Sequence, residues 1–139
     1  MRPSIRLLLI LFLSVTVLPA VAEDEEVTKS AAIYYQFPAK PPIQIDFTRQ
    51  SGGLVSILQA EVALMSHDQA IIDITETNLT MIKHSLRRFL SKQTMEDVNS
   101  VAGREALQKK SLAMINEILK EESGKDGIED LFFTSFILQ

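Results

Sequence analysis

The sequence predicts a small α+β domain in which helices pack on one face of a mostly antiparallel sheet. Three observations predict this class. Apolar residues recur at every second position in the segments before residue 66, and they recur with a helical period from about residue 68 to residue 121. A short aromatic and aliphatic run then closes the chain. The expected order is three strands, two long helices and a fourth strand.

The first 22 residues are separate from this domain. Arg2 and Arg6 precede the apolar stretch Leu7–Leu18, which ends at Pro19 before Ala20-Val21-Ala22. This order is typical of a secretory signal with an A-x-A cleavage site. The stretch is shorter than the roughly 20 residues that usually cross a bilayer, which favours a cleaved signal, although tilt or local thinning would accommodate a short span. We expect residues 1–22 to be a signal peptide or a short membrane anchor, with the rest of the chain outside the cytoplasm.

Residues 23–30 are expected to be an acidic linker and residues 31–139 the extracytoplasmic domain. The chain has 139 residues, 46% of them hydrophobic, and a formal net charge of -4. Its first 22 residues hold two basic residues and no acidic one, so the remainder is more acidic than this total. An acidic balance argues against nucleic acid as a partner. The absence of cysteine excludes a disulfide scaffold, a thiolate zinc site, a cysteine nucleophile and a lipidated cysteine.

The first part of the domain predicts three strands. Ala31–Phe37 and Ile43–Phe47 alternate in polarity, and the three prolines within Pro38–Pro42 predict a loop between them. Ser51-Gly52-Gly53 predicts a hairpin loop leading into a longer strand, Leu54–Met65. One face of this strand is expected to be buried, and it comprises Leu54, Leu58, Ala60, Val62 and Leu64.

Two helices are predicted next. The first spans about Asp68–Ser91, because its apolar residues share one helix face; these are Ile71, Ile72, Leu79, Ile82, Leu86, Phe89 and Leu90. Thr94, with Asp97 three positions later, predicts the capped start of a second helix that continues to Glu121. Gly103 predicts a kink or a break within it, because glycine costs about 1 kcal/mol relative to alanine inside a helix.

The end of the chain predicts a turn and a strand. Gly124 and Gly127 bracket the turn. Ile128–Leu138 is too short for a globular helix and rich enough in phenylalanine and aliphatic residues to be a strand buried on both faces. We expect Phe133 and Leu86 to be core residues.

Candidate groups for catalysis or metal binding are few. Neither His67 nor His84 has an HxxxH or HxxE spacing, and His67-Asp68 is interpreted as a helix start. The best carboxylate pairs, Asp73 with Glu76 and Glu96 with Asp97, are typical of helix surfaces. No G-x-S-x-G turn or phosphate-binding loop is present in the sequence. We therefore expect no catalytic residues, no metal and no cofactor.

One basic run remains on the first helix. Lys83, Arg87, Arg88 and Lys92 lie on one side of it. The simpler interpretation is a solvated face beside the core stripe. The other is a surface that receives an acidic partner or a lipid headgroup.

Three segments together carry a family resemblance. The first is Tyr34-Tyr35-Gln36-Phe37-Pro38 with the strand after it. The second is Ile82–Leu119, which contains Leu86-Arg87-Arg88-Phe89-Leu90-Ser91 and Gly103-Arg104-Glu105-Ala106-Leu107. The third is the closing segment Phe132–Gln139. In this order they resemble the opening strand, paired helices and closing strand of the FliL family, flagellar basal-body-associated proteins whose extracytoplasmic domain accompanies the motor stator.

The resemblance implies a non-enzymatic protein that supports or stabilises the motor stator in motility. It implies the stator and basal-body proteins as partners, and a stomatin/SPFH-like fold whose neighbouring copies form rings, hence a homo-oligomer. The protein is then expected in the periplasm, or in the inner membrane with a periplasmic domain if residues 1–22 stay uncleaved. The chain departs from the usual family pattern at its signal-like N-terminus and at His84, where an acidic residue is usual. The alternative is a secreted periplasmic binding or chaperone-like module on the same fold with no flagellar role.

Overall fold

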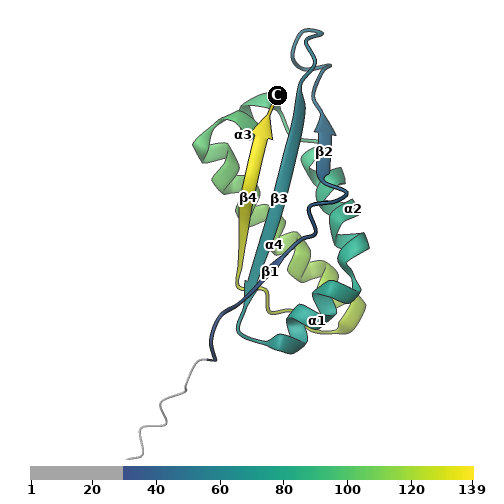
Figure 1. Ribbon diagram of the computed structural model, residues 1–139, viewed down its shortest axis with the longest axis vertical. Coiled ribbons are helices and arrows are strands. Elements are labelled where there is room, and N and C mark those ends of the chain that lie inside the picture. The colour runs from purple at the N-terminus through teal and green to yellow at the C-terminus, as the bar shows by residue number, and fades with distance from the viewer. Residues whose placement is uncertain (1–29) are drawn as a thin grey trace, which may run out of the picture.

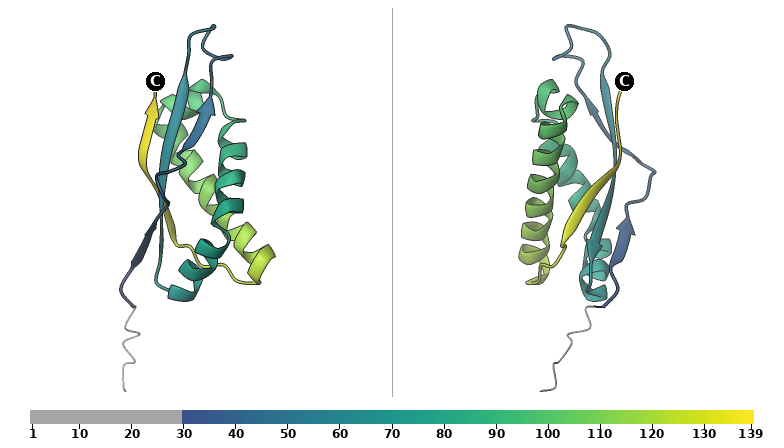
Figure 2. Two further views of the ribbon diagram at one scale, coloured as in Figure 1. Left: turned by 45° about the vertical axis from the view of Figure 1, so that its right-hand side comes forward. Right: turned by 90° about the vertical axis from the view of Figure 1, so that its left-hand side faces the viewer.

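The computed structural model describes residues 30–139 (Figure 1). The expected signal peptide or anchor (residues 1–22) and all of the acidic linker except Ser30 lie outside the described residues. The elements are, in order, β1 (Ile33–Gln36), β2 (Ile43–Asp46), β3 (Ile57–Ser66), α1 (Gln69–Thr77), α2 (Leu79–Leu90), α3 (Met95–Asn99), α4 (Val101–Ser123) and β4 (Asp130–Leu138). The helices form one layer behind the sheet (Figures 1 and 2), which confirms the predicted α+β class.

The sheet is antiparallel and β3 is its central strand. One edge of β3 pairs with β4, and the other pairs first with β1 and then with β2. β1 and β2 therefore follow one another along the same edge, and Pro38–Pro42 loops out between them. The β2–β3 hairpin and the proline loop are both as predicted.

The core lies between the sheet and the helices. Four β3 residues on the predicted face, Leu58, Ala60, Val62 and Leu64, are at most 1% exposed. The predicted stripe of the first helix is buried against them, with Ile82, Leu86 and Leu90 fully inaccessible. Leu107, Ile115 and Leu119 of α4 complete this layer. Each such side chain contributes about 1.5–3 kcal/mol by its burial.

The first predicted helix is divided at Asn78, a correction to the expected continuous helix. The side chains of Thr75, Thr77 and Asn78 bond to the carbonyls of the residues four positions earlier, at 2.7–2.9 Å. Such bonds compete with the main-chain ladder and bend helices. Asn78 has ψ near 11°, so α1 ends there and α2 begins at Leu79.

The second predicted helix is also divided, at Ser100 rather than at Gly103. The capping box of Thr94 and Asp97 is present as predicted, and it starts the short helix α3. Ser100 is extended, and its hydroxyl accepts the Gly103 N–H at 3.0 Å to cap α4. Gly103 itself is helical. A Cβ at this position would collide with the main-chain carbonyl of Asp97, so the glycine allows α3 and α4 to approach closely.

The strand predicted over Leu54–Met65 begins only at Ile57. Gly52 and Gly53 have positive φ, and the turn they form continues through a Leu54 N–H bond to the Ser51 carbonyl. This hairpin loop projects beyond the helices (Figure 2), so no core is present to bury Leu54, which is 74% exposed. The expected burial of Leu54 is therefore wrong.

β4 is a strand as predicted, but it is not buried on both faces. Its register with β3 places Leu131, Phe133 and Phe136 on the helix side. Phe132 and Ile137 lie on the face that none of the helices within residues 30–139 covers, and Ile137 is 51% exposed. The helices form a single layer, so an apolar run in this strand does not imply two buried faces.

Candidate interaction surfaces

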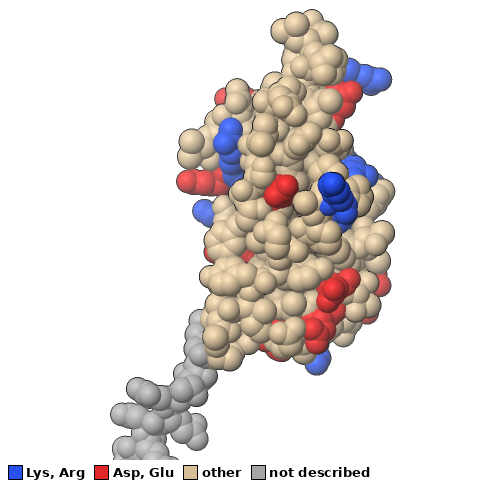
Figure 3. All heavy atoms as spheres, viewed as in Figure 1, with Lys and Arg blue, Asp and Glu red and all other residues tan. Residues whose placement is uncertain are grey.

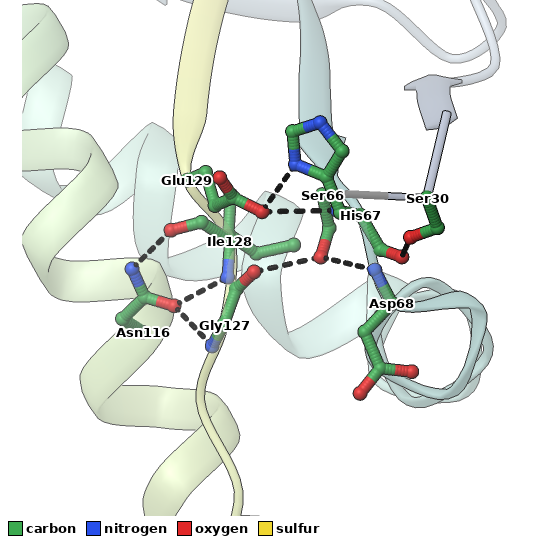
Figure 4. A network of polar contacts seen from close by, with 8 residues as sticks. All are labelled: Ser30, Ser66, His67, Asp68, Asn116, Gly127, Ile128 and Glu129. Carbon is green, nitrogen blue, oxygen red and sulfur yellow. Dashed lines mark hydrogen bonds and ion pairs between the residues drawn. The ribbon is translucent and has the colours of Figure 1, made fainter. Parts of the chain in front are cut away.

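A polar network at the base of the domain ties together the ends of several elements (Figure 4). The Glu129 carboxylate lies 2.7 Å from His67 Nδ1 and accepts the His67 N–H at 3.0 Å. The Ser30 hydroxyl donates to the His67 carbonyl at 2.6 Å. Asp68 caps α1 by accepting the Ala70 N–H, as the sequence predicted for a helix start. The network therefore fixes the point at which the chain enters the domain.

The same network fixes the loop between α4 and β4. Asn116 accepts the N–H groups of Gly127 and Ile128 and donates to the Ile128 carbonyl, all within 3.1 Å. The Ser66 hydroxyl donates to the Gly127 carbonyl at 2.7 Å. Sequence reasoning missed Asn116 and Glu129, because their partners are distant in the chain. The one available signal was a polar side chain at position 116 beside buried Ile115.

The flank of the domain carries a basic hollow, formed where the proline loop meets α2. It has a volume of about 360 Å³, and its lining residues are Pro38, Lys40, Pro41, Leu79, Thr80, Lys83, His84 and Arg87. None of these is acidic. Figure 3 shows basic side chains gathered on this flank of a domain that is acidic overall.

Lys83 holds the two sides of the basic hollow together. Its Nζ donates to the carbonyls of Pro41 and Pro38, at 2.6 and 3.3 Å. Burial and, second, the neighbouring Arg87 lower the pKa of Lys83 from its ordinary value. The basic run is therefore not one uniform solvated face: Lys83 is half-buried, whereas Arg87, Arg88 and Lys92 are exposed.

A second surface lies along the outer side of β4. This β4 groove has a volume of about 310 Å³ and is lined by Val101, Arg104, Glu105, Gln108, Phe132, Phe133 and Phe136. The Arg104 guanidinium lies 5.3 Å from the centroid of the Phe136 ring, within cation–π distance. Val101 is 76% exposed at its rim.

β4 also offers an open strand edge. Within residues 30–139 it pairs only with β3. Ile57 and Gln139 exchange both main-chain hydrogen bonds. In an antiparallel ladder the alternate residues Leu138 and Phe136 then direct their N–H and C=O groups away from β3. The groove and the edge together present aromatic side chains beside unpaired main-chain groups.

The uncovered face of the sheet has little charge. It is the face toward the viewer in Figure 3, where Lys, Arg, Asp and Glu side chains are sparse. Tyr34 and Phe132 lie on it with their ring centroids 6.2 Å apart. Gln36 Nε2 donates to Thr134 Oγ1 beside them, at 3.1 Å. This face is continuous with the β4 groove through Phe132.

The remaining predicted candidates lie apart from one another. His84 lines the basic hollow, whereas His67 belongs to the basal network. Asp73 accepts a hydrogen bond from Gln69 on the surface of α1, and Asp97 serves as part of a helix cap. Ser51-Gly52-Gly53 lies in the hairpin loop, as predicted. The structure brings none of these groups together.

The described residues offer neither a metal-binding cluster nor a membrane-spanning helix. Residues 30–139 contain no group of three or more His, Asp or Glu side chains placed to hold a metal ion. In the same range no helix is long and apolar enough to cross a membrane.

Comparison with known proteins identifies one family. Residues 36–139 match the sequence model described as "Flagellar basal body-associated protein FliL". The matched range begins in β1 and includes every later element. No curated protein sequence matches the chain at a significant level.

Proposed function

Since the chain belongs to the FliL family of flagellar basal-body-associated proteins, we propose that it is a non-enzymatic accessory of the flagellar motor that supports the stator. The observation that carries this proposal is the extent of the family match, which covers both main helices and the closing strand. The placement of the candidate chemical groups agrees with it. Asp97 belongs to a helix cap, His67 to the basal network and Asp73 to a hydrogen bond on the surface of α1.

We place the domain in the periplasm. The support is the signal-like order of residues 1–22, which would export the chain whether or not it is cleaved. Mass measurement of the protein from the soluble periplasmic and membrane fractions tests the two forms. A soluble product that begins at Glu23 would favour a free periplasmic accessory, whereas an intact N-terminus in the membrane fraction would favour an anchored one.

We also propose that copies of the domain associate through the β4 groove and the adjoining strand edge. Unpaired main-chain groups on an edge strand are a template for pairing with another chain. The edge of β4 carries neither proline nor lysine, which are common guards against such pairing. The groove beside it supplies aromatic rings and an arginine, residue types that are enriched in protein interfaces.

Deletion of the gene tests the proposed role at the motor. We expect the deletion strain to swim less far in soft agar and to carry fewer fluorescently labelled stator units per motor. Expression of the wild-type chain should restore both. Unchanged swimming and stator occupancy would contradict the proposal and favour a periplasmic module without a flagellar role.

A further inference from the structure

We propose that the basic hollow binds an acidic segment of a partner protein, through carboxylate contacts to Arg87 and Lys83. The proline loop and α2, which line the hollow, lie on one flank of the domain, and β4 lies on the other (Figure 1), so the hollow is a second docking site, independent of self-association. The positive charge of the hollow and the shape of its walls indicate which kind of molecule it binds.

The charge of the basic hollow has no acidic counterpart among the residues that line it. Lys40, Lys83 and Arg87 converge on it, and no acidic residue lines it. Within residues 30–139, the one ion pair is that of His67 with Glu129, at the base of the domain. Within the described part of the chain these three basic side chains have no carboxylate partner, and in a protein with a net charge of -4 they form a concentrated positive site.

The donors in the basic hollow are already positioned. Two of the three N–H groups of the Lys83 ammonium are engaged by the carbonyls of Pro38 and Pro41, so one remains to meet an anion. Arg87 lies one helical turn further along α2, and its guanidinium can hold a carboxylate with two parallel hydrogen bonds. Lys83 and Arg87 are four residues apart and face the same space.

The walls of the hollow favour a peptide over a lipid surface. Pro38, Pro41 and Leu79 provide apolar walls beside the charges, which suits an acidic residue followed by an apolar one. The proline loop and α2, which line the site, lie on the flank of the domain rather than at the end where β1 begins (Figure 1). A membrane facing the end where β1 begins would not face this flank.

Titration of the isotopically labelled full chain with a glutamate octapeptide tests the proposal, with a glutamine octapeptide as the neutral control. We expect saturable amide shifts in residues 38–42 and 79–87 with the glutamate peptide alone. Arg87→Glu should weaken binding by about tenfold or more, the loss expected for one charge-assisted contact. Arg88→Glu is the matched control, because Arg88 is exposed in the same last turn of α2 but does not line the hollow. Arg88→Glu should weaken peptide binding by less than about threefold, because it changes only the long-range electrostatic attraction.

Three results would overturn the proposal. Equal losses in the Arg87 and Arg88 variants would indicate a diffuse electrostatic attraction without a site. Shifts that leave residues 38–42 and 79–87 unaffected would place the contact elsewhere. Binding of phosphatidylglycerol vesicles that Arg87→Glu abolishes, without peptide binding, would make the hollow a headgroup site. The motility and stator assays are independent of all three.

Discussion

The two faces of the sheet differ in what they contribute, and β3 shows the difference within one strand. On the helix side its residues Leu58, Val62 and Leu64 are completely buried. Gln59 and Glu61 lie on the other side of the strand and are only partly buried, and no helix within residues 30–139 packs on that side. The covered face determines the fold, because it is where apolar area is removed from water. The uncovered face and the adjacent edge of β4 are free to take part in contacts with other molecules.

The largest effect is expected from a charge placed on the covered face. Leu86→Asp should unfold the domain, because an unpaired buried carboxylate costs several kcal/mol against a total stability of about 5–15 kcal/mol. Circular dichroism with a thermal melt measures this. Arg88→Asp, exposed on the same helix, is the control and should melt cooperatively. A folded Leu86→Asp protein with a normal melting temperature would show that the covered face does not hold the fold.

Substitution of two adjacent phenylalanines in β4 compares directly how much each face of the sheet contributes to stability. Phe133 faces the helices and packs on the core, whereas Phe132 lies on the uncovered face. We expect Phe133→Ala to cost about 2–3 kcal/mol, less than for a fully buried ring because it is half-buried, and Phe132→Ala about 1 kcal/mol. Urea denaturation gives both values. Equal losses in the free energy of unfolding would contradict the proposed difference between the two faces.

The helix layer depends on the close approach of α3 and α4. Gly103→Ala should lower stability by about 1–2 kcal/mol, although alanine favours helices, because the added Cβ meets the Asp97 carbonyl. Ala102→Val, at an exposed position in the same turn, should cost less than about 1 kcal/mol. A more stable Gly103→Ala protein would show that the two helices can separate at no cost.

A smaller effect is expected from pH at the start of α3. Hydrogen bonds from the Thr94 N–H, which has the larger effect, and from the Thr94 hydroxyl lower the pKa of Asp97 from its ordinary value of 3.8. The cap therefore stabilises the fold above pH 3.8, and this stabilisation is lost as the pH falls through the lower folded-state pKa. Urea midpoints from pH 5 down to pH 2.5 should fall less steeply for Asp97→Asn than for the exposed neighbour Glu96→Gln. Parallel curves for the two variants would contradict this role of the cap.

The sequence predicted the elements that depend on local pattern. The alternation in β3 and the stripe containing Ile82 and Leu86 were correct, because burial on one face imposes a period on the residues themselves. The capping box of Thr94 was also correct, since its partners are three residues apart.

Two of the wrong predictions depended on three-dimensional contacts that the local pattern does not show. Nothing local indicates that Gly103 faces the Asp97 carbonyl, or that the loop carrying Leu54 projects beyond the helices. The same limit applies to the candidate sites. The basic residues of α2 were recognised, but the basic hollow also requires the proline loop, whose carbonyls lie 42 and 45 residues from Lys83 in the chain. The β4 groove forms only because α4 lies beside β4, and no sequence motif predicts that these two elements are neighbours.

The proposed association of copies of the domain through the β4 groove is tested most directly by sedimentation velocity of three full-length proteins. Val101 and Leu54 are both highly exposed apolar residues, but only Val101 lines the β4 groove. We predict that the wild-type chain and Leu54→Arg sediment as oligomers, whereas Val101→Arg sediments as a folded monomer with an unchanged circular dichroism spectrum. A monomeric wild-type chain at high concentration, or an oligomer that Val101→Arg leaves intact, would contradict the claim.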